Sequence, residues 1–365
     1  MPEKIVHITT VHSARDPRIY YKECKSLADA NFQVSLLAPG DENSCENNID
    51  IIALGFPKNR IHRATLYQLK TLLKAIQQKS CIYHFHDPEL IFTGLILKIM
   101  GKKVIYDVHE DVPQDILLKK HIPKMLRILL AQAARLSEKI AGYCFDAIIT
   151  VTPTIAKKFP AKKVSLVRNF PRINAQDFSF SDYDKRDKEL VYIGNMNEHR
   201  GLKEMVAAVS QLNMETKASL MLVGKMSADM EEKYIKFNKH IEYLSWLPFP
   251  EVSKVLNASK IGLVILHPTK TFISSYPLKF FEYMASGLPI IASNFPEWEA
   301  IIQKYDCGIT VDPEDVESIT KAIAYLLTNV EEAYKKGQNG RKAVLAEFSW
   351  EEEARVLTQV YQRLS

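Results

Sequence analysis

Residues 274–293 read SSYPLKFFEYMASGLPIIAS, and this stretch predicts a short helix followed at once by a buried strand. Pro277 suits the first position of a helix, and Gly287 suits the position just after a helix ends. The strand PIIAS is almost wholly apolar, as expected for a parallel strand that is covered on both faces. A helix joined to such a strand by a tight turn is the repeating unit of an α/β sheet.

The same alternation of apolar strands and helical periodicity extends outward over most of the chain. In the first half, we expect strands at 4–11, 33–38, 49–54, 81–85, 103–107, 147–151 and 164–168. In the second half, we expect strands at 189–194, 218–224, 240–244, 261–265, 289–293 and 307–311. Such strands, separated by helices, predict parallel sheets with right-handed crossovers. The fold class is therefore α/β, with two Rossmann-like, doubly wound parallel-sheet domains that face a cleft at the carboxyl ends of their strands.

A polar segment without periodicity separates the two halves. Residues 171–188 read PRINAQDFSFSDYDKRDK and predict a linker between domains at 1–170 and 189–348. Asp182 and Asp184 have the DxD spacing that some metal-dependent transferases use, but we interpret them as part of the solvated linker. Ser349 and Glu352 form a capping box. They begin a helix at about 349–365 that we expect to pack back on the first domain.

Length and composition exclude several classes of protein. A chain of 365 residues is long enough for two domains, and 47% apolar with 25% charged residues is ordinary for a soluble globular protein. The longest nearly apolar run, at 90–100, contains Lys98 and is too short to span a membrane. The start of the chain reads as a first strand rather than a signal peptide. The five cysteines are scattered, which indicates a reducing, cytoplasmic environment.

Positive charge is concentrated in one region. Residues 118–168 hold 11 basic and 2 acidic residues, which suggests an anionic partner. Within it, residues 121–143 carry a helical apolar stripe that we expect to pack on the sheet: Ile122, Met125, Leu126, Leu129, Ala133, Leu136 and Ile140. Basic residues lie on another face: Lys120, Lys124, Arg127 and Arg135. We expect that basic face to contact an anionic membrane through residues 119–139, although an ordinary crossover helix fits the pattern as well. No aromatic platform accompanies the charge, so we expect no nucleic acid partner.

The candidate chemistry is concentrated at 274–293. Neither a dinucleotide-binding GxGxxG nor a P-loop motif is present in the sequence. The amino terminus of the helix offers free N–H groups to an anion. Lys279 and Glu282 share a helix face. They could bind a nucleotide diphosphate and its ribose diol, or they could form a surface ion pair.

The segment FFEYMASGLPIIAS resembles the donor-binding motif of GT-B glycosyltransferases of family 4, which are mostly retaining enzymes. The resemblance implies that Glu282 binds the ribose hydroxyls. Members of the family usually have another glutamate eight positions earlier, near the transferred sugar, and in this chain that position is Ser274. The resemblance also implies that N–H groups around Ser275, Pro277 and Leu278 face the diphosphate.

A second resemblance lies at the end of the first strand of the second half, in YIGNMNEHRGLKEMV at 192–206. Asn195 stands at the family's first basic position and Arg200 at its second, where a basic side chain holds the diphosphate. Lys279 would restore the missing charge. A solvated residue at the start of a helix is the alternative for Arg200. Two further segments, LMLVG at 220–224 and LSWLP at 244–248, resemble the strand ends that lie beside the nucleotide base in the family. They add Gly224 and Trp246 to the expected nucleotide-sugar site.

In the first half, YHFHDPEL and YDVHEDVP resemble a bacterial subgroup of the family that assembles cell-surface polysaccharides. We expect His109 to lie near the transferred sugar, unless it is a structural histidine. Glu110 follows it, and we expect Glu110, Asp16 and Arg18 on the acceptor side. His84, His86 and Asp87 are possible metal ligands, but no second cluster in the sequence completes a set of four, so we predict no metal site.

These residues predict a metal-independent hexosyltransferase. We expect His109, Arg200 and Lys279 to take part in the transfer of a hexosyl group from a nucleotide-diphosphate sugar to a saccharide or lipid-linked saccharide. We expect retention of configuration, no cofactor besides this co-substrate, and a cytoplasmic location at the inner face of the plasma membrane. A sugar-nucleotide epimerase and a non-catalytic nucleotide-sugar-binding subunit remain as alternatives. The base, the sugar, the acceptor and the oligomeric state stay open.

Overall fold

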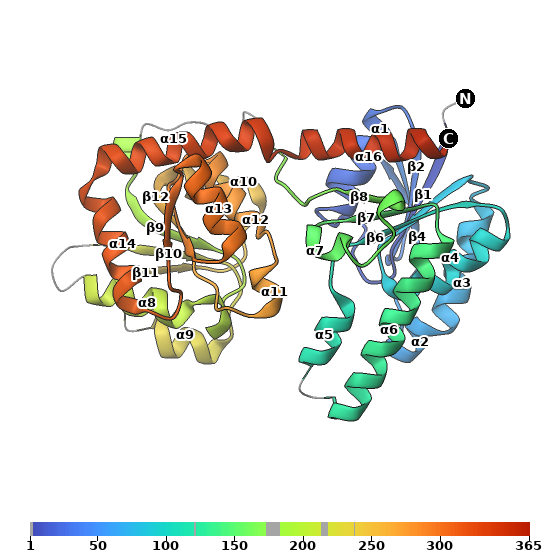
Figure 1. Cartoon of the computed structure of the whole chain (residues 1–365), viewed down its shortest axis with the longest axis horizontal. Helices are drawn as coiled ribbons and strands as arrows, with labels where there is room; N and C mark the ends of the chain where they lie inside the picture. The colour runs from blue at the N-terminus through green and yellow to red at the C-terminus, as the bar shows by residue number, and fades with distance from the viewer. Residues whose placement is uncertain (1–2, 120–121, 173–182, 213–217, 237) are drawn as a thin grey trace. The chain divides into compact units, whose positions relative to one another are not determined.

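The computed structural model describes residues 3–119, 122–172, 183–212, 218–236 and 238–365. It contains two compact units, which we describe separately (Figure 1). Unit 1 consists of Met1–Asn169 with Trp350–Ser365, and unit 2 consists of Phe170–Ser349. Most of the expected linker, including Asp182 of the DxD spacing, lies outside the described residues.

Unit 1 is built around an eight-stranded sheet of order β3-β4-β2-β1-β5-β6-β7-β8. Every neighbouring pair is parallel except β3 with β4. The strands are β1 (Lys4–Ile8), β2 (Gln33–Ala38), β3 (Ser44–Glu46), β4 (Ile49–Ala53), β5 (Ile82–Phe85), β6 (Lys103–Val108), β7 (Ala147–Thr150) and β8 (Val164–Leu166). The register of β1 against β5 places His7 opposite His84, which brings two distant parts of the sequence together.

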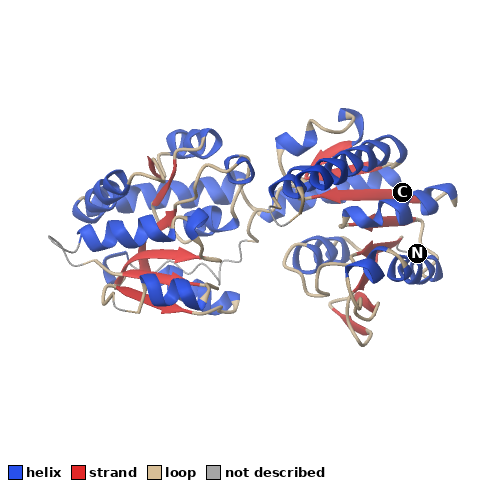
Figure 2. Ribbon diagram, turned by 90° about the horizontal axis from the view of Figure 1, so that it is seen from below, coloured by secondary structure: helices blue, strands red, loops and turns tan. Residues whose placement is uncertain are grey.

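Helices cover both faces of this sheet (Figure 2). They are η1 (Ile19–Cys24), α1 (Lys25–Asp29), α2 (Arg60–Ala64), α3 (Leu66–Gln77), η2 (Pro88–Leu90), α4 (Ile91–Ile99), α5 (Val112–Leu118), α6 (Lys124–Cys144), α7 (Pro153–Ala156), η3 (Ala161–Lys163) and α16 (Trp350–Leu364). The carboxy-terminal helix α16 belongs to the core of unit 1. Its Trp350 and Tyr361 are fully buried, and the indole N–H of Trp350 donates to Ser26 Oγ at 2.8 Å.

Unit 2 contains a six-stranded, wholly parallel sheet of order β11-β10-β9-β12-β13-β14. The strands are β9 (Lys188–Ile193), β10 (Leu220–Val223), β11 (Ile241–Leu244), β12 (Ser259–Val264), β13 (Ile290–Ser293) and β14 (Gly308–Val311). The helices are η4 (Tyr183–Lys185), η5 (Glu198–Arg200), α8 (Leu202–Leu212), α9 (Ala228–Tyr234), α10 (Phe249–Ala258), α11 (Lys270–Ile273), α12 (Leu278–Ala285), α13 (Pro296–Tyr305), α14 (Val316–Thr328) and α15 (Val330–Glu347). The expected pair of α/β parallel sheets is confirmed.

The predicted helix at 274–293 is α12, but it starts one residue later than expected. Pro277 is the N-cap, with an extended ψ of 131°, rather than the first helical residue. The end of the helix is as predicted, because Gly287 has a φ of 68° and its N–H donates to Met284 O at 3.0 Å. The chain then turns directly into β13. Tyr283 fixes the helix to β9, since its hydroxyl accepts the N–H of Ile193 at 2.8 Å.

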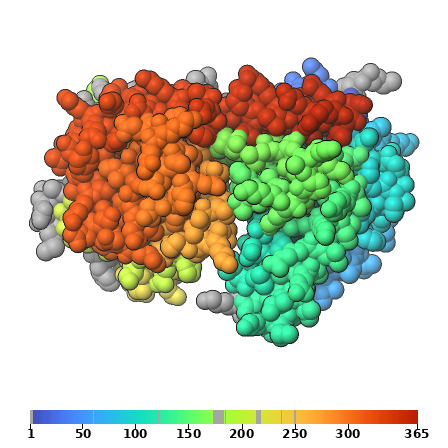
Figure 3. Space-filling model, in the orientation of Figure 1, coloured from blue at the N-terminus to red at the C-terminus, as the bar shows by residue number. Residues whose placement is uncertain are grey.

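Helix α6 differs from the prediction in the orientation of its apolar stripe. Only Ala131, Glu138, Ala141 and Gly142 are buried on this 21-residue helix. The stripe expected against the sheet is mostly exposed instead, with Met125 71% and Leu129 and Leu136 each 60% accessible to solvent. Figures 1 and 3 show the α5–α6 hairpin projecting from the rest of unit 1. Periodicity identified the helix correctly but could not identify which face meets the domain.

None of the described helices combines the length and the apolar character needed to cross a bilayer.

Candidate functional site

In unit 2, two glycines open space at the carboxyl ends of neighbouring strands. Gly194 follows β9 and Gly224 follows β10, with φ values of 129° and 136°. A Cβ atom on Gly224 would lie 2.2 Å from the carbonyl oxygen of Gly194, and one on Gly194 would lie 3.1 Å from Lys279 Nζ. Glycine is therefore required at both turns, and their close approach leaves room for the lysine side chain.

Lys279, in the first turn of α12, carries a buried and unpaired ammonium group. Its exposed fraction is 7%, and Nζ lies 3.5 Å from the centroid of the Tyr192 ring. Nζ has no hydrogen-bond partner among the residues that the structure describes. Burial holds the pKa of Lys279 well below its ordinary value, the charge of Arg200 lowers it further, and Glu282 opposes both. A buried cation without a partner is costly, so this position favours an anionic ligand.

Arg200 and Glu282 flank this lysine, as the sequence predicted. The charges of both side chains act on the pKa of Lys279, so both lie near it. Asn197 caps the turn that holds Arg200, because its side-chain oxygen accepts the Arg200 N–H at 3.0 Å. Glu282 is only 8% exposed. The alternative of a surface ion pair between Lys279 and Glu282 is therefore wrong, since both side chains are buried.

The other residues that the sequence predicted for the donor site bond mainly within the protein. The carbonyl of Asn195 accepts the Tyr192 hydroxyl at 3.0 Å, and the carbonyl of Ser275 accepts the Trp298 indole N–H at 2.7 Å. Leu278 begins α12 directly after Pro277. Ser274, which replaces the family glutamate, donates its hydroxyl to Lys270 O at 3.1 Å. Trp246 follows edge strand β11 and exposes 65% of its surface.

Unit 1 has a polar cavity of about 440 Å³ at the carboxyl ends of β5 and β6. His109 and Glu110 line it, together with His12, His86, Asp87 and Asp107. Arg18 lies buried behind Asp107, which accepts two hydrogen bonds from its guanidinium at 3.0 and 3.1 Å. Arg18 therefore shapes the cavity through Asp107 rather than by lining it.

His12 was missed by the sequence analysis, although the structure places it between two carboxylates. Its Nδ1 lies 3.3 Å from Asp16, and its Nε2 lies 3.5 Å from Asp87. The hydrogen bond to Asp16 raises the pKa of His12, while burial opposes the shift. Burial would raise the pKa of Asp16, but His12 and backbone N–H groups lower it to about 2. An aspartate four residues after a histidine, in the loop that follows the first strand, was the available signal.

Beneath the cavity, a chain of buried hydrogen bonds runs from Asp107 to α16. Burial would raise the pKa of Asp107, but Arg18 and two histidines hold it well below its ordinary value, so it only accepts hydrogen bonds. His86 Nδ1–H must then donate to Asp107, at 3.1 Å, which leaves His86 Nε2 to accept from His7 Nδ1–H at 3.0 Å. By the same logic, the Tyr361 hydroxyl donates to His7 Nε2 at 3.0 Å and accepts from His84 Nδ1–H at 2.7 Å.

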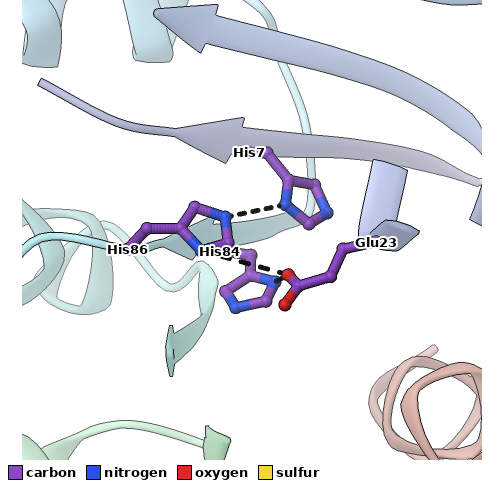
Figure 4. A group of neighbouring side chains, drawn as sticks. All are labelled: His7, Glu23, His84 and His86. Atoms are coloured by element: carbon purple, nitrogen blue, oxygen red, sulfur yellow. Dashed lines mark hydrogen bonds and ion pairs between the residues drawn. The ribbon is translucent and has the colours of Figure 1, made fainter. Parts of the chain in front are cut away.

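Two groups of side chains in the described chain have the residue types of a metal site. One is His7, Glu23, His84 and His86 (Figure 4), and the other is His86, Asp107 and His109. His7 and Glu23 are far from His84 and His86 in sequence, which is why the sequence analysis found no complete set. However, the imidazole nitrogens between Asp107 and Tyr361 already serve as donors and acceptors to one another. A metal ion would have to break that chain, so these residues fit hydrogen bonding better than coordination.

We predict that Tyr361→Phe lowers the free energy of unfolding of unit 1 by about 1–3 kcal/mol, because it leaves His7 Nε2 and His84 Nδ1–H buried without a partner. Urea unfolding of the full chain measures the change. Tyr325→Phe is the matched control, since Tyr325 is exposed and its hydroxyl bonds the surface residue Glu332. Equal stability of the two variants would contradict the assigned hydrogen-bond chain.

Comparison with known proteins identifies a family for each half of the chain. Residues 18–169 match the family described as "Glycosyltransferase Family 4", and residues 187–329 match "Glycosyl transferases group 1". Among curated proteins, an MMP alpha-(1->4)-mannosyltransferase of Mycolicibacterium hassiacum is 27% identical over 169 residues, which are 45% of this chain and 40% of that protein. The chain spans less than half the length of the first curated relatives that it matches.

Solved structures share the fold over nearly the whole chain. Sucrose-phosphate synthase from Thermosynechococcus elongatus superimposes with a TM-score of 0.76 at 18% identity, over 99% of both chains. Anabaena HepE in complex with UDP-glucose superimposes with a TM-score of 0.72 at 11% identity, again over 99% of both chains. The first half of the chain therefore matches a family 4 glycosyltransferase domain and the second half a group 1 glycosyltransferase domain, and the chain shares the fold of sucrose-phosphate synthase.

Proposed function

We propose that this protein transfers a hexosyl group from a nucleotide-diphosphate sugar to a saccharide or lipid-linked saccharide acceptor, with retention of anomeric configuration. The observation that carries the proposal is the buried, unpaired ammonium of Lys279 in a family of nucleotide-sugar enzymes. The similarity to an O-antigen chain mannosyltransferase of Escherichia coli supports a role in cell-surface polysaccharide synthesis.

In this proposal, unit 2 binds the donor through three charged side chains. Lys279 and Arg200 neutralise the diphosphate, and Glu282 accepts hydrogen bonds from the ribose hydroxyls. The N–H group of Leu278 faces the phosphates, whereas the Ser275 N–H already donates to Phe272 O at 3.1 Å. Gly224 and Trp246 flank the base. HepE, which has a similar fold, was crystallised with UDP-glucose, and this supports the donor class.

Transfer produces negative charge on the departing nucleoside diphosphate. Lys279 and Arg200 would stabilise that charge where it develops, in a site that is already poor in water. Such stabilisation performs the task that a divalent cation performs in other transferases, so we propose metal-independent transfer with no cofactor beyond the donor. The cavity of unit 1 would bind the acceptor side, with His109 beside the reacting sugar and Glu110 and Asp16 shaping the pocket.

We also propose that the protein acts at the cytoplasmic face of the membrane, which it contacts through residues 119–139. The support is the α6 surface, where exposed Met125, Leu129 and Leu136 alternate with basic residues. Exposed apolar side chains together with Lys and Arg are typical of helices that lie in a membrane interface. The apolar stripe that was expected in the core is thus available to lipid.

The first test asks which donor binds and what becomes of it. A thermal-shift panel of UDP-, GDP-, ADP- and CMP-sugars should single out one class, because a ligand of the native state raises its stability. Incubation with that donor alone should then release free nucleotide slowly. Accumulation of an epimerised nucleotide sugar would instead establish an epimerase, and tight binding without turnover on any acceptor would establish a binding subunit.

Glu282→Ala should weaken binding of the selected nucleotide sugar by about 1–3 kcal/mol, because a charged hydrogen-bond acceptor for the ribose is lost. Calorimetric titration measures the change, and Glu251→Ala, an exposed glutamate on α10, serves as the control. Unchanged affinity in the Glu282 variant would refute its role at the ribose.

Lys279→Met should reduce affinity for the nucleoside diphosphate far more than affinity for the bare nucleoside, and Arg200→Ala should do the same. Lys279→Met should also raise the melting temperature of the ligand-free chain, because a desolvated ammonium gives way to an apolar side chain of similar length. Lys203→Ala, which removes an exposed lysine of α8, is the control. Equal losses for nucleoside and nucleoside diphosphate would count against the phosphate assignment.

A further inference from the structure

A second cavity in unit 1 lies between α5, α6 and the residues that follow α7. Its volume is about 540 Å³, and three basic side chains line it: Arg135, Lys139 and Lys158. Two carboxyl groups, those of Asp111 and Glu138, also line it. Asp111 already forms an ion pair with Lys158. Positive charge therefore exceeds negative charge in this cavity when Glu138 is ionised, and the excess grows when Glu138 is neutral.

Glu138 is a buried acid whose carboxyl group is not fully satisfied. The residue is 5% exposed, and its Oε1 has no hydrogen-bond partner in the described part of the chain. Burial raises the pKa of Glu138 to about 7; Asp111 also raises it, while Lys158 and Arg135 lower it. Close to neutral pH the group therefore exists partly as the acid, which can donate a hydrogen bond to an oxyanion.

Apolar side chains lie directly beside the basic ones on α6. Leu136 follows Arg135 and Ile140 follows Lys139, and both apolar side chains are exposed. Tyr143 belongs to both features, because it lines the cavity and exposes most of its surface. An anionic group in the cavity would thus sit next to an apolar ridge, which is the arrangement of headgroup and acyl chains in a phospholipid.

We propose that this cavity binds the phosphate of an anionic phospholipid through the side chains that line it: Arg135, Lys139, Lys158 and Glu138. The exposed apolar side chains of α6 beside the cavity contact the acyl chains of that lipid. This inference rests on the proposed membrane contact and gives it a specific site. The phosphate accepts hydrogen bonds from Arg135 and Lys139, and it also accepts one from Glu138 when that residue is protonated. Binding should therefore strengthen as the pH falls from about 8 to about 6, on either side of the pKa of Glu138.

Flotation of the full chain with lipid vesicles tests this site. We expect binding to phosphatidylcholine vesicles that contain phosphatidylglycerol, stronger at about pH 6 than at about pH 8. Arg135→Ala with Lys139→Ala should weaken binding roughly tenfold or more. Glu138→Gln should remove the pH dependence by keeping a neutral donor at that position. Lys254→Ala with Lys321→Ala, which removes two exposed lysines of unit 2, should change nothing.

The other outcomes separate the possible failures. If wild-type protein floats but neither the Arg135/Lys139 variant nor Glu138→Gln differs from it, the cavity is not the lipid site. If inorganic phosphate binds in an Arg135- and pH-dependent way while no vesicle does, the ligand is free phosphate and the lipid assignment is overturned. If wild-type protein binds no vesicle, the proposed membrane contact itself fails. Nucleotide affinity, measured in parallel, reports on the donor site independently of all three.

Discussion

The site in unit 2 depends on the burial of one ammonium group. Lys279 points over the ring of Tyr192 and toward the Gly194 turn, where a side chain on that glycine would crowd it. Tyr283 on the same helix holds the end of β9 in place through a hydrogen bond to Ile193. Three features therefore act together on Lys279: helix α12, the end of that helix at Gly287, and the glycine turns after β9 and β10. They keep the Lys279 amino group away from water and without a hydrogen-bond partner among the described residues, in a position that favours an anionic ligand.

In unit 1, a different constraint supports the cavity at the carboxyl ends of β5 and β6. Asp107 is held ionised by Arg18, and this fixes the direction of every hydrogen bond from His86 through His7 to Tyr361. Because Tyr361 belongs to α16, the last helix of the chain helps to hold the ends of β1 and β5 beneath the cavity. The three histidines of the group that resembles a metal site are thus held by hydrogen bonds within the protein.

The sequence predicted the features that depend on local pattern. Apolar runs identified every strand of both sheets except β3, a three-residue antiparallel edge strand that is too short to carry a pattern. The motif around Lys279 and Glu282 singled out two side chains that the structure buries on α12. Features that depend on packing escaped prediction. The exposed face of α6, the approach of His7 to His84 and the placement of His12 between Asp16 and Asp87 arise from tertiary contacts between distant segments.

The most direct test of the central claim is proton uptake on donor binding. A nucleotide-diphosphate sugar should raise the depressed pKa of Lys279, so the fraction of Lys279 that is a neutral amine takes up a proton as the ligand binds. Calorimetric titrations over a series of pH values, in buffers of different ionisation enthalpy, measure that uptake. The account predicts net uptake in the wild-type protein and none in Lys279→Met. Binding without proton uptake in the wild type, or the same uptake in both proteins, would contradict it.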